Sequence, residues 1–280
     1  MISVTKTFLP PQEEYNAILK RAWDTNWMTN RGVLVKELEV ELKKYLGVNE
    51  IIAMANGTLP LQIAIKALNL TGEIITTPFS YVATTSSIVW EGSTPVFVDI
   101  DPSYLTIDET KIEDAITSKT SAILATHVFG NPCNVEVIEQ IASKHNLRVI
   151  YDAAHCFGVS YKGQSIFNYG DISTCSFHAT KIFHTGEGGA LFCNEDLYKE
   201  MYLHHNFGHD GPDVFTGLGI NAKMSELQAA MGLSVLPYFK LIFTNRKKVV
   251  HQYKDFLNFK NFKELTIRPG TDCNYSYYPI

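Results

Sequence analysis

Short apolar runs alternate with segments of helical spacing along most of this chain. Residues 73–77 and the runs P-V-F-V-D and S-A-I-L-A-T have the continuous apolar character of buried strands, and a polar turn follows each. Strands of a parallel sheet have this character because helices cover both faces of the sheet. The pattern therefore predicts an α/β protein with a mainly parallel, helix-covered sheet.

The predicted helices lie between these strands. A long helical pattern begins near Ser225 and runs to about residue 257, which is a suitable length for a connector between domains. We therefore expect a large domain over 1–235, including an N-terminal arm, and a connector helix with the start of a small α+β domain over 236–280. Gly47 is expected to cap the second helix at its C-terminus. The other helices are predicted at 13–23, 33–46, 135–145 and 195–206, after the turn N-G-T, and from Asp108.

Three polar side chains follow two apolar runs in the middle of the chain. The run V-I-Y ends in Asp152, and the run D-I-S-T-C-S ends in Ser176 with Lys181 shortly after it. Ligands of open α/β sheets bind at the carboxyl ends of the strands. These three side chains are therefore candidates for one site.

The residue types indicate a particular cofactor chemistry. A lysine that attacks a carbonyl to form a Schiff base must be neutral, a state that partial burial favours. An aspartate facing a pyridine nitrogen keeps that nitrogen protonated, so that the ring accepts electrons from a carbanion. A serine hydroxyl can hold a phosphate. Lys181, Asp152 and Ser176 together therefore point to pyridoxal phosphate (PLP).

A candidate phosphate cradle precedes the third predicted helix, whose apolar face is Leu61, Ala64, Ile65 and Leu68. In the turn Asn56-Gly57-Thr58, the glycine allows close approach of a ligand and the threonine hydroxyl can donate. The helix N-terminus that follows favours anions. Taken alone, these residue types more often serve only to cap a helix.

Two aromatic positions have a functional and a structural interpretation. Tyr81 follows the strand at 73–77 and could lie flat on a cofactor ring, although an isolated tyrosine is usually part of the core or its rim. The loop T-N-W-M-T-N-R-G, residues 25–32, is equally consistent with a surface connection and with a loop that contacts substrate.

Composition narrows the class of protein. The 280 residues are 45% hydrophobic and 19% charged, with a formal net charge of −5 and no basic patch that would indicate nucleic acid or an anionic membrane as partner. Five cysteines contain no C-x-x-C pair, which indicates a reducing compartment without a disulfide framework. Neither a signal peptide nor an apolar run long enough to span a membrane is recognised. The expected location is the cytoplasm.

The chain resembles the DegT/DnrJ/EryC1/StrS family of sugar aminotransferases, members of the fold type I (aspartate aminotransferase-like) PLP enzymes. The resemblance runs from about residue 5 to the end and depends on four motifs occurring in order. These are P-V-F-V-D-I-D-P, D-A-A-H-C-F-G, S-F-H-A-T-K followed by T-G-E-G-G-A, and G-I-N-A-K-M-S-E-L-Q-A-A.

The resemblance implies a role for each motif residue. Lys181 forms the Schiff base with the cofactor and then moves the proton between the substrate carbon and the cofactor. Asp152 pairs with the pyridinium nitrogen, His155 reaches the phenolic oxygen of the ring, and Tyr81 stacks on the ring. The implied phosphate ligands are Gly57, Thr58 and Ser176 together with Asn221, which would cross from the second subunit of a homodimer with shared active sites.

The resemblance also implies the reaction. Glutamate gives its amino group to the cofactor, and a nucleotide-linked keto-deoxysugar then receives it. The likeness favours a dTDP-4-keto-6-deoxyhexose aminated at C4 for surface polysaccharide or O-antigen. Two features depart from the family. Lys223 stands where an arginine is usual, and lysine cannot make the planar bidentate contact of an arginine. Members also usually continue for about a third of this length beyond residue 280, which would complete the small domain.

The residue types also allow other functions. A catalytically impaired or regulatory PLP-binding relative on the same scaffold is the main alternative, and a sugar dehydratase of the family is disfavoured because those members carry histidine in place of Lys181. A nicotinamide-binding Rossmann domain is disfavoured because G-E-G-G precedes an apolar run instead of opening a helix. A zinc site fits by residue type but not by spacing. Its ligands would be Asp152, His155, Cys175 and His178.

Overall fold

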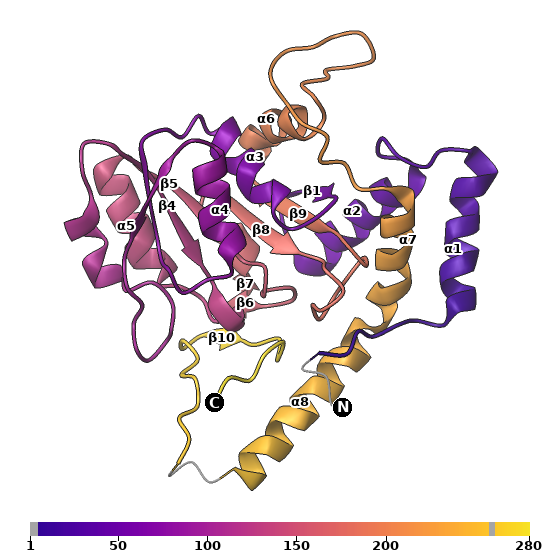
Figure 1. Ribbon diagram of the computed structural model, residues 1–280. Coiled ribbons are helices and arrows are strands. Elements are labelled where there is room, and N and C mark those ends of the chain that lie inside the picture. The colour runs from indigo at the N-terminus through magenta and orange to yellow at the C-terminus, as the bar shows by residue number, and fades with distance from the viewer. Residues whose placement is uncertain (1–4, 258–260) are drawn as a thin grey trace.

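The computed structural model describes residues 5–257 and 261–280. Its centre is a seven-stranded sheet with the strand order β1-β9-β8-β5-β4-β2-β3 (Figure 1). In this sheet β9 runs antiparallel to its neighbours β1 and β8, and the remaining pairs are parallel. The predicted fold class is confirmed. The strands are β1 (Glu50–Met54), β2 (Glu73–Thr76), β3 (Thr94–Phe97), β4 (Thr120–Thr126), β5 (Arg148–Asp152), β8 (Ile172–Ser176) and β9 (Gly189–Cys193).

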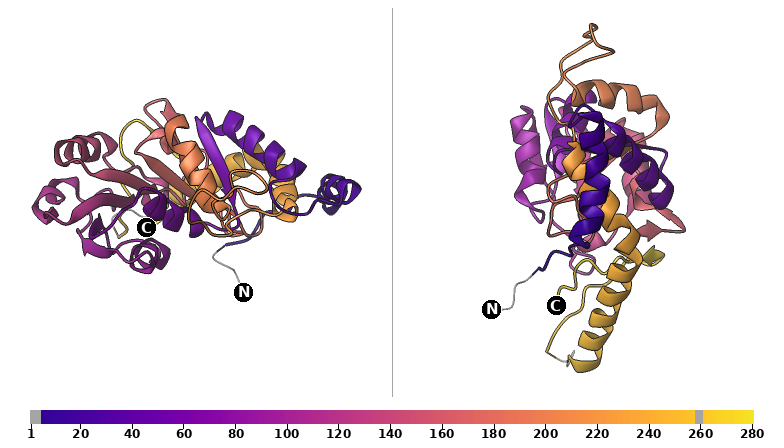
Figure 2. Two further views of the ribbon diagram at one scale, coloured as in Figure 1. Left: turned by 90° about the horizontal axis from the view of Figure 1, so that it is seen from above. Right: turned by 90° about the vertical axis from the view of Figure 1, so that its right-hand side faces the viewer.

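Helices cover both faces of this sheet, as the two further views of Figure 2 show. One face packs against α3 (Leu59–Ala67), α4 (Val82–Trp90) and α6 (Glu195–His205). The other packs against α2 (Val33–Leu46), α5 (Val135–His145) and α7 (Glu226–Val235), and α1 (Gln12–Thr25) lies outside α7. The predicted bounds of α2 and α5 are confirmed, and Gly47 ends α2 with a φ of 63°.

The helix predicted from Asp108 is wrong. The chain forms only two 3-10 turns there, η1 (Glu109–Lys111) and η2 (Glu113–Ala115). Ile112 is the one buried residue between positions 109 and 115, so there is no apolar face to hold a longer helix. The side chain of Asp108 caps the first turn by accepting a hydrogen bond from the backbone N–H of Thr110.

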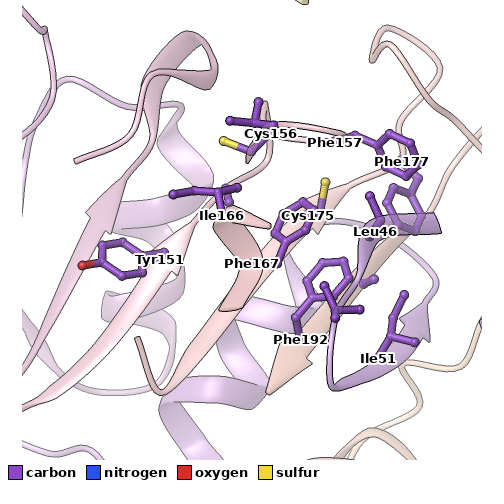
Figure 3. Packing of buried hydrophobic residues seen from close by; sticks show 14 of the residues in the cluster. Leu46, Ile51, Tyr151, Cys156, Phe157, Ile166, Phe167, Cys175, Phe177 and Phe192 are labelled. Carbon is purple, nitrogen blue, oxygen red and sulfur yellow. The ribbon is translucent and has the colours of Figure 1, made fainter. Parts of the chain in front are cut away.

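Alternating side chains of the strands enter two separate clusters. In β5, Val149 and Tyr151 join the cluster on the α5 side, whereas Ile150 joins the cluster on the α3 side. Figure 3 shows part of the first cluster, in which sulfur and aromatic side chains meet. There the rings of Phe167 and Phe192 stack with centroids 4.1 Å apart. Burial on both faces explains why these strands have continuous apolar sequences.

The N-terminus of α2 is closed by a side chain from a distant part of the chain. Glu226, in the first turn of α7, is fully buried, and its carboxylate accepts hydrogen bonds from the backbone N–H groups of Leu34 and Val35 at 2.7 and 3.1 Å. A Cβ on Gly32 would come within 2.6 Å of the Glu226 side chain, so a larger residue there would displace the Glu226 carboxylate. Glu226 therefore caps the N-terminus of α2, whereas Ser225 and Gln228 cap α7 itself.

The predicted connector is a run of helical turns from Glu226 to Phe256. It comprises α7, the 3-10 turn η5 (Leu236–Tyr238) and α8 (Phe239–Phe256). By length and composition alone this run could cross a membrane, whereas no apolar run of that length was expected. In the fold, α7 packs against α1 and α2, as expected of a core helix in a globular domain.

Residues 261–280 return to the large domain after α8. This segment contributes one short strand, β10 (Thr271–Asp272), which pairs with β6 (Ser160–Tyr161). β6 pairs in turn with β7 (Gln164–Ser165), and Figure 1 shows this small sheet below the large one. The domain division at residue 235 remains a prediction, but this segment lies against the large domain near Asp152.

Candidate active site

A cavity of about 310 Å³ opens at the carboxyl ends of β1, β5 and β8. Asp152 is the last residue of β5, Ser176 is the last of β8, and the turn at residues 56–58 follows β1. The topology therefore brings to one edge groups that are more than a hundred positions apart in the sequence. The lining residues are Asn56, Gly57, Thr58, Leu61, Tyr81, Ala83, Asp152, Ala154, His155, Ser176, His178, Thr180, Lys181 and Glu187.

A second cavity of about 370 Å³ adjoins the first. Both are lined by Tyr81, Asp152, Ala154, His155 and Lys181. The second extends away from the 56–58 turn towards Phe79, Phe129 and Tyr277. The two cavities therefore form one cleft, with polar groups and a helix N-terminus at one end and aromatic rings at the other.

The carboxylate of Asp152 is buried and firmly held. Its Oδ2 accepts a hydrogen bond from the Thr84 hydroxyl at 2.7 Å, and its Oδ1 accepts one from the backbone N–H of Ala154 at 3.1 Å. Burial raises the pKa of Asp152, and both hydrogen bonds and the nearby charge of Lys181 act in the opposite direction. A cationic ring nitrogen in the cleft would stabilise the ionised carboxylate further.

Lys181 lies in the loop that joins β8 to β9. The loop is tightened by backbone hydrogen bonds from Phe177 to Gly188 and from Ala179 to Gly186, at 2.8 and 2.7 Å. The amine of Lys181 is half-buried and donates to the Tyr277 hydroxyl at 3.3 Å. The loop therefore holds the backbone of Lys181 rigidly while its long side chain reaches into the cleft.

The turn after β1 has the features of a phosphate cradle. The side chain of Asn56 accepts hydrogen bonds from the N–H groups of Thr58 and Leu59, both at 2.9 Å. Thr58 makes no side-chain cap for α3, so its hydroxyl is not occupied in that way. A Cβ on Gly57 would come within 2.7 Å of the Ser176 Cβ, so glycine is needed for the turn to approach β8. Capping, the simpler interpretation of this turn, is therefore met by Asn56 and not by the Thr58 side chain.

His155 is placed to donate a hydrogen bond into the cleft. Its Nδ1 accepts a hydrogen bond from the backbone N–H of Phe129 at 3.1 Å. Burial and the neighbouring charge of Lys181 lower the pKa of His155 to about 3, so the ring is neutral near pH 7. A neutral ring whose Nδ1 accepts must carry its proton on Nε2. That N–H is suited to an oxygen such as the phenolic oxygen of PLP.

The remaining predicted residues are divided between the cleft and the surface. Tyr81 precedes α4 and lines both cavities, with 77% of its surface exposed. Asn221 does not line the cleft; it is exposed and forms an antiparallel bridge with Asn206. Lys223, where the family usually has arginine, places its amine 4.8 Å from the centre of the Phe207 ring. Seven of the eight predicted residues therefore meet in one cleft of a single chain, and Asn221 does not.

Sequence reasoning missed several residues of the cleft. No role was predicted for Thr84, which is buried beside the cleft, and its bond to Asp152 follows from the position of α4 near the end of β5. Tyr277 and Phe129 also had no predicted role in the site. Their sequences carry no local signal of function. Among the described ranges, 5–257 and 261–280, there is no cluster of three or more His, Cys, Asp or Glu side chains that could hold a metal ion.

The donor set of the cleft fits PLP. A phosphate would meet the Gly57 turn, the hydroxyls of Thr58 and Ser176 and the N-terminus of α3. A pyridine ring would lie between these groups and the aromatic end of the cleft, with Asp152 for its nitrogen and Lys181 for its aldehyde. The fit depends on the close Gly57–Ser176 approach, because a Cβ at position 57 would collide with Ser176 and move the turn away from β8.

Comparisons with known proteins identify the family of the chain. The model of the DegT/DnrJ/EryC1/StrS aminotransferase family matches residues 11–280. The dTDP-4-amino-4,6-dideoxy-D-glucose transaminase of Shigella dysenteriae is 44% identical, over 100% of this chain and 77% of that protein. The Escherichia coli protein of the same name is 42% identical, over 100% and 76%. The crystal structure of DesI in the presence of its TDP-sugar product superposes with a TM-score of 0.94 at 34% identity, over 99% of this chain and 71% of that one.

Proposed function

Because the chain belongs to the DegT/DnrJ/EryC1/StrS aminotransferase family, we propose that it aminates a dTDP-4-keto-6-deoxyhexose at C4. The chain is an enzyme, and its family uses PLP. The choice of sugar and carbon is supported by the similarity over the full chain to two transaminases whose names place the amine on C4 of a dTDP-linked 4,6-dideoxyglucose.

Each residue of the cleft has a proposed task. PLP, when bound, supplies the electron sink for the reaction. Asp152 holds the charge of the ring nitrogen, His155 donates to the phenolic oxygen, and Tyr81 covers one face of the ring. Lys181 holds the cofactor covalently between turnovers, and its amine then moves the proton at the reacting carbon. The cleft thereby fixes the reacting bond relative to one acid and one amine.

The phosphate is proposed to bind at the Gly57 turn. The backbone there approaches Ser176 closely, and the N-terminus of α3 provides a favourable dipole for an anion. Gly57, Thr58 and Ser176 hold the phosphate from one subunit. Asn221 is proposed to supply a further ligand to the same phosphate from the second subunit.

A homodimer with shared sites is supported by the surface around Asn221. The loop at 207–219 precedes Asn221 and stands clear of the helices at one end of the molecule (Figures 1 and 2). Its apolar side chains Val214, Phe215 and Leu218 are between 52% and 67% exposed. Exposed apolar surface of this kind marks a contact with another chain. A partner subunit would cover these side chains and bring Asn221 to its own cleft.

The proposed donor is glutamate, and the proposed product is an activated amino sugar for surface polysaccharide or O-antigen. Cytoplasmic location is supported by the cysteines: the described residues include five free thiols, four of them buried, and no disulfide. The aromatic end of the cleft, at Phe79, Phe129 and Tyr277, offers stacking surfaces for the ring of a nucleotide-linked sugar.

The observation that carries the proposal is the 44% identity across the whole chain, combined with the acid and the amine in one cleft. The test is to incubate the protein with PLP, glutamate and a panel of keto-sugars linked to dTDP, UDP or GDP. Mass spectrometry should show replacement of the carbonyl oxygen by an amino group for dTDP-4-keto-6-deoxyglucose. Turnover of a 3-keto or GDP-linked sugar in its place would contradict the proposed substrate, and PLP binding without turnover would favour an impaired relative.

A further inference from the structure

Tyr277 reaches the amine of Lys181 from the C-terminal segment. The Tyr277 hydroxyl lies 3.3 Å from Lys181 Nζ, 96 positions away in sequence, and it is the one hydrogen-bond partner of that amine among the described residues. The ring of Tyr277 lies 4.5 Å from the ring of His155, centroid to centroid, and lines the aromatic end of the cleft. One tyrosine therefore contacts both of the basic side chains at the centre of the site.

We propose that Tyr277 is a positioning residue for Lys181, which orients the free amine towards the bond that it must form with the cofactor. The proposal rests on the function proposed above. A lysine side chain has four rotatable carbon–carbon bonds and samples many directions unless a partner selects one of them. The Tyr277 hydroxyl provides such a partner whenever Lys181 is not covalently attached to the cofactor.

The backbone around Tyr277 is fixed by the large domain. The side-chain amide of Asn274 donates to the carbonyl oxygens of His155 and Phe157, at 2.8 and 3.0 Å. The Asn274 side-chain oxygen accepts from the Ser276 N–H at 2.9 Å. Asn274 is buried, so these bonds are shielded from water. The segment therefore has a defined position relative to the strand that carries Asp152.

A second contact fixes the segment from the other side. Arg246, on α8, donates to the carbonyl oxygen of Ser276 at 2.9 Å. Tyr275, between the two anchored residues, has a φ of 54°, in the left-handed region that non-glycine residues seldom adopt. Tyr275 adopts this conformation, and Tyr277, two residues later, lines the cleft.

A purely structural role would not require the hydroxyl of Tyr277. If Tyr277 only filled space against His155 and Phe129, phenylalanine would serve as well, because the ring makes those contacts. The hydrogen bond to Lys181 is the feature that only tyrosine provides. Tyr277→Phe removes that bond and keeps the ring, so it separates the two roles.

The neighbouring residue offers a matched control. Tyr278 has a hydroxyl with no hydrogen-bond partner among the described side chains, and it packs beside Tyr253 on α8, away from the cleft. Tyr278→Phe removes the same atom from the same segment. An effect of Tyr277→Phe that Tyr278→Phe does not reproduce is therefore specific to the contact with Lys181.

The experiment measures cofactor capture by the full chain after removal of bound cofactor. PLP is added, borohydride fixes the captured cofactor at successive times, and mass spectrometry measures the labelled Lys181 peptide. Pyridoxamine phosphate, which has no aldehyde and cannot bond to Lys181, reports the integrity of the rest of the site. Because the hydrogen bond that selects the direction of the amine is lost, Tyr277→Phe should capture PLP about tenfold more slowly. Its affinity for pyridoxamine phosphate should match that of the wild type, as should both measurements for Tyr278→Phe.

Two results would overturn the proposal. One is capture by Tyr277→Phe at the wild-type rate, which would show that the hydroxyl does not orient the amine. The other is an equal loss of pyridoxamine phosphate affinity in Tyr277→Phe, which would show that Tyr277 only supports the fold. Failure of the wild-type protein to label Lys181 at all is a different outcome, and it would contradict the proposed function itself.

Discussion

The hydroxyl of Thr84 donates a hydrogen bond of 2.7 Å to the carboxylate Oδ2 of Asp152. Both side chains are buried, and the two residues come from different elements, the first turn of α4 and the end of β5. This bond orients the carboxylate at the bottom of the cleft. It also lowers the pKa of Asp152, whereas burial raises it.

Thr84→Val should lower the rate of the reaction and shift the acid side of its pH profile to higher pH. Loss of the hydrogen bond raises the pKa of Asp152, so the carboxylate stays protonated to a higher pH and the fall in activity on the acid side shifts upwards. The rate near neutral pH should decrease about tenfold, the effect of one bond to a charged group. The pH profile of kcat/KM measures both effects, and Thr84→Ser should restore them. An unchanged profile in Thr84→Val would show that Asp152 does not depend on this hydroxyl.

Glu226 should prove important for stability and not for chemistry. Its carboxylate accepts from two backbone N–H groups of α2, and Glu226→Ala leaves both of them buried without a partner. Each such group costs about 1–3 kcal/mol, so the free energy of unfolding should fall by several kcal/mol. Urea denaturation of the full chain measures this loss. The matched control is Glu195→Gln, at an exposed position in the first turn of α6.

The outcome for Glu195→Gln should be a change within about 0.5 kcal/mol, as for surface helix charges in general. An equally small change for Glu226→Ala would contradict the role of Glu226 at the start of α2. Glu226→Gln keeps one acceptor oxygen and can satisfy one of the two backbone donors. Its loss of unfolding free energy should therefore lie between those of Glu195→Gln and Glu226→Ala.

Acid should destabilise the fold through buried histidines. Burial lowers the pKa of His127 from 6.5 to about 3, so the unfolded chain binds a proton below pH 6.5 that the folded chain does not bind until about pH 3. The free energy of unfolding contributed by His127 is therefore present above pH 6.5 and is lost as the pH falls towards 3. His155 and His205 act in the same direction.

The measurement is urea denaturation at several pH values between 6.5 and 4.5. His127→Asn keeps an acceptor for the Cys133 N–H but cannot bind the proton. The slope of unfolding free energy against pH should decrease by up to about 1.4 kcal/mol per pH unit in this variant. Equal slopes for the wild type and His127→Asn would contradict the assignment of this histidine as neutral in the fold.

Mixed dimers should test the shared site. Lys181→Ala subunits lack the amine, and Asn221→Ala subunits lack the proposed phosphate ligand that they give to their partner. A mixed dimer has one complete site, with Lys181 from one subunit and Asn221 from the other. Random exchange should therefore restore activity to about a quarter of the wild-type value at limiting PLP. No gain on mixing, with dimers demonstrated by light scattering, would show that Asn221 does not cross between subunits.

Much of the fold could be predicted from the spacing of apolar residues. The strands buried on both faces and the helices α2 and α5 have clear patterns, and Gly47 marks the end of α2. Asp152, Ser176 and Lys181 were found because they follow buried strands, and the sheet topology places strand ends together. The helix from Asp108 was not found in the structure, since its apolar stripe consists of Ile112 alone.

The contacts between distant segments could not be predicted in this way. Glu226 has the sequence pattern of an ordinary first-turn acid, yet it caps a helix 192 positions earlier. Thr84 and Tyr277 meet Asp152 and Lys181 through the packing of α4 and of the C-terminal segment, which no local pattern specifies. Periodicity predicts which face of an element is buried, but it does not identify the residue on the other side.

The central claim is that Lys181 and Asp152 hold one cofactor between them. The most direct test is to reduce the PLP-loaded protein with borohydride and to locate the added mass by peptide sequencing. The account predicts that the label lies on the peptide containing Lys181, that Lys181→Ala carries none, and that Asp152→Asn still becomes labelled while its turnover falls by several powers of ten. A label on another lysine, such as Lys223, or full turnover by Lys181→Ala would contradict it.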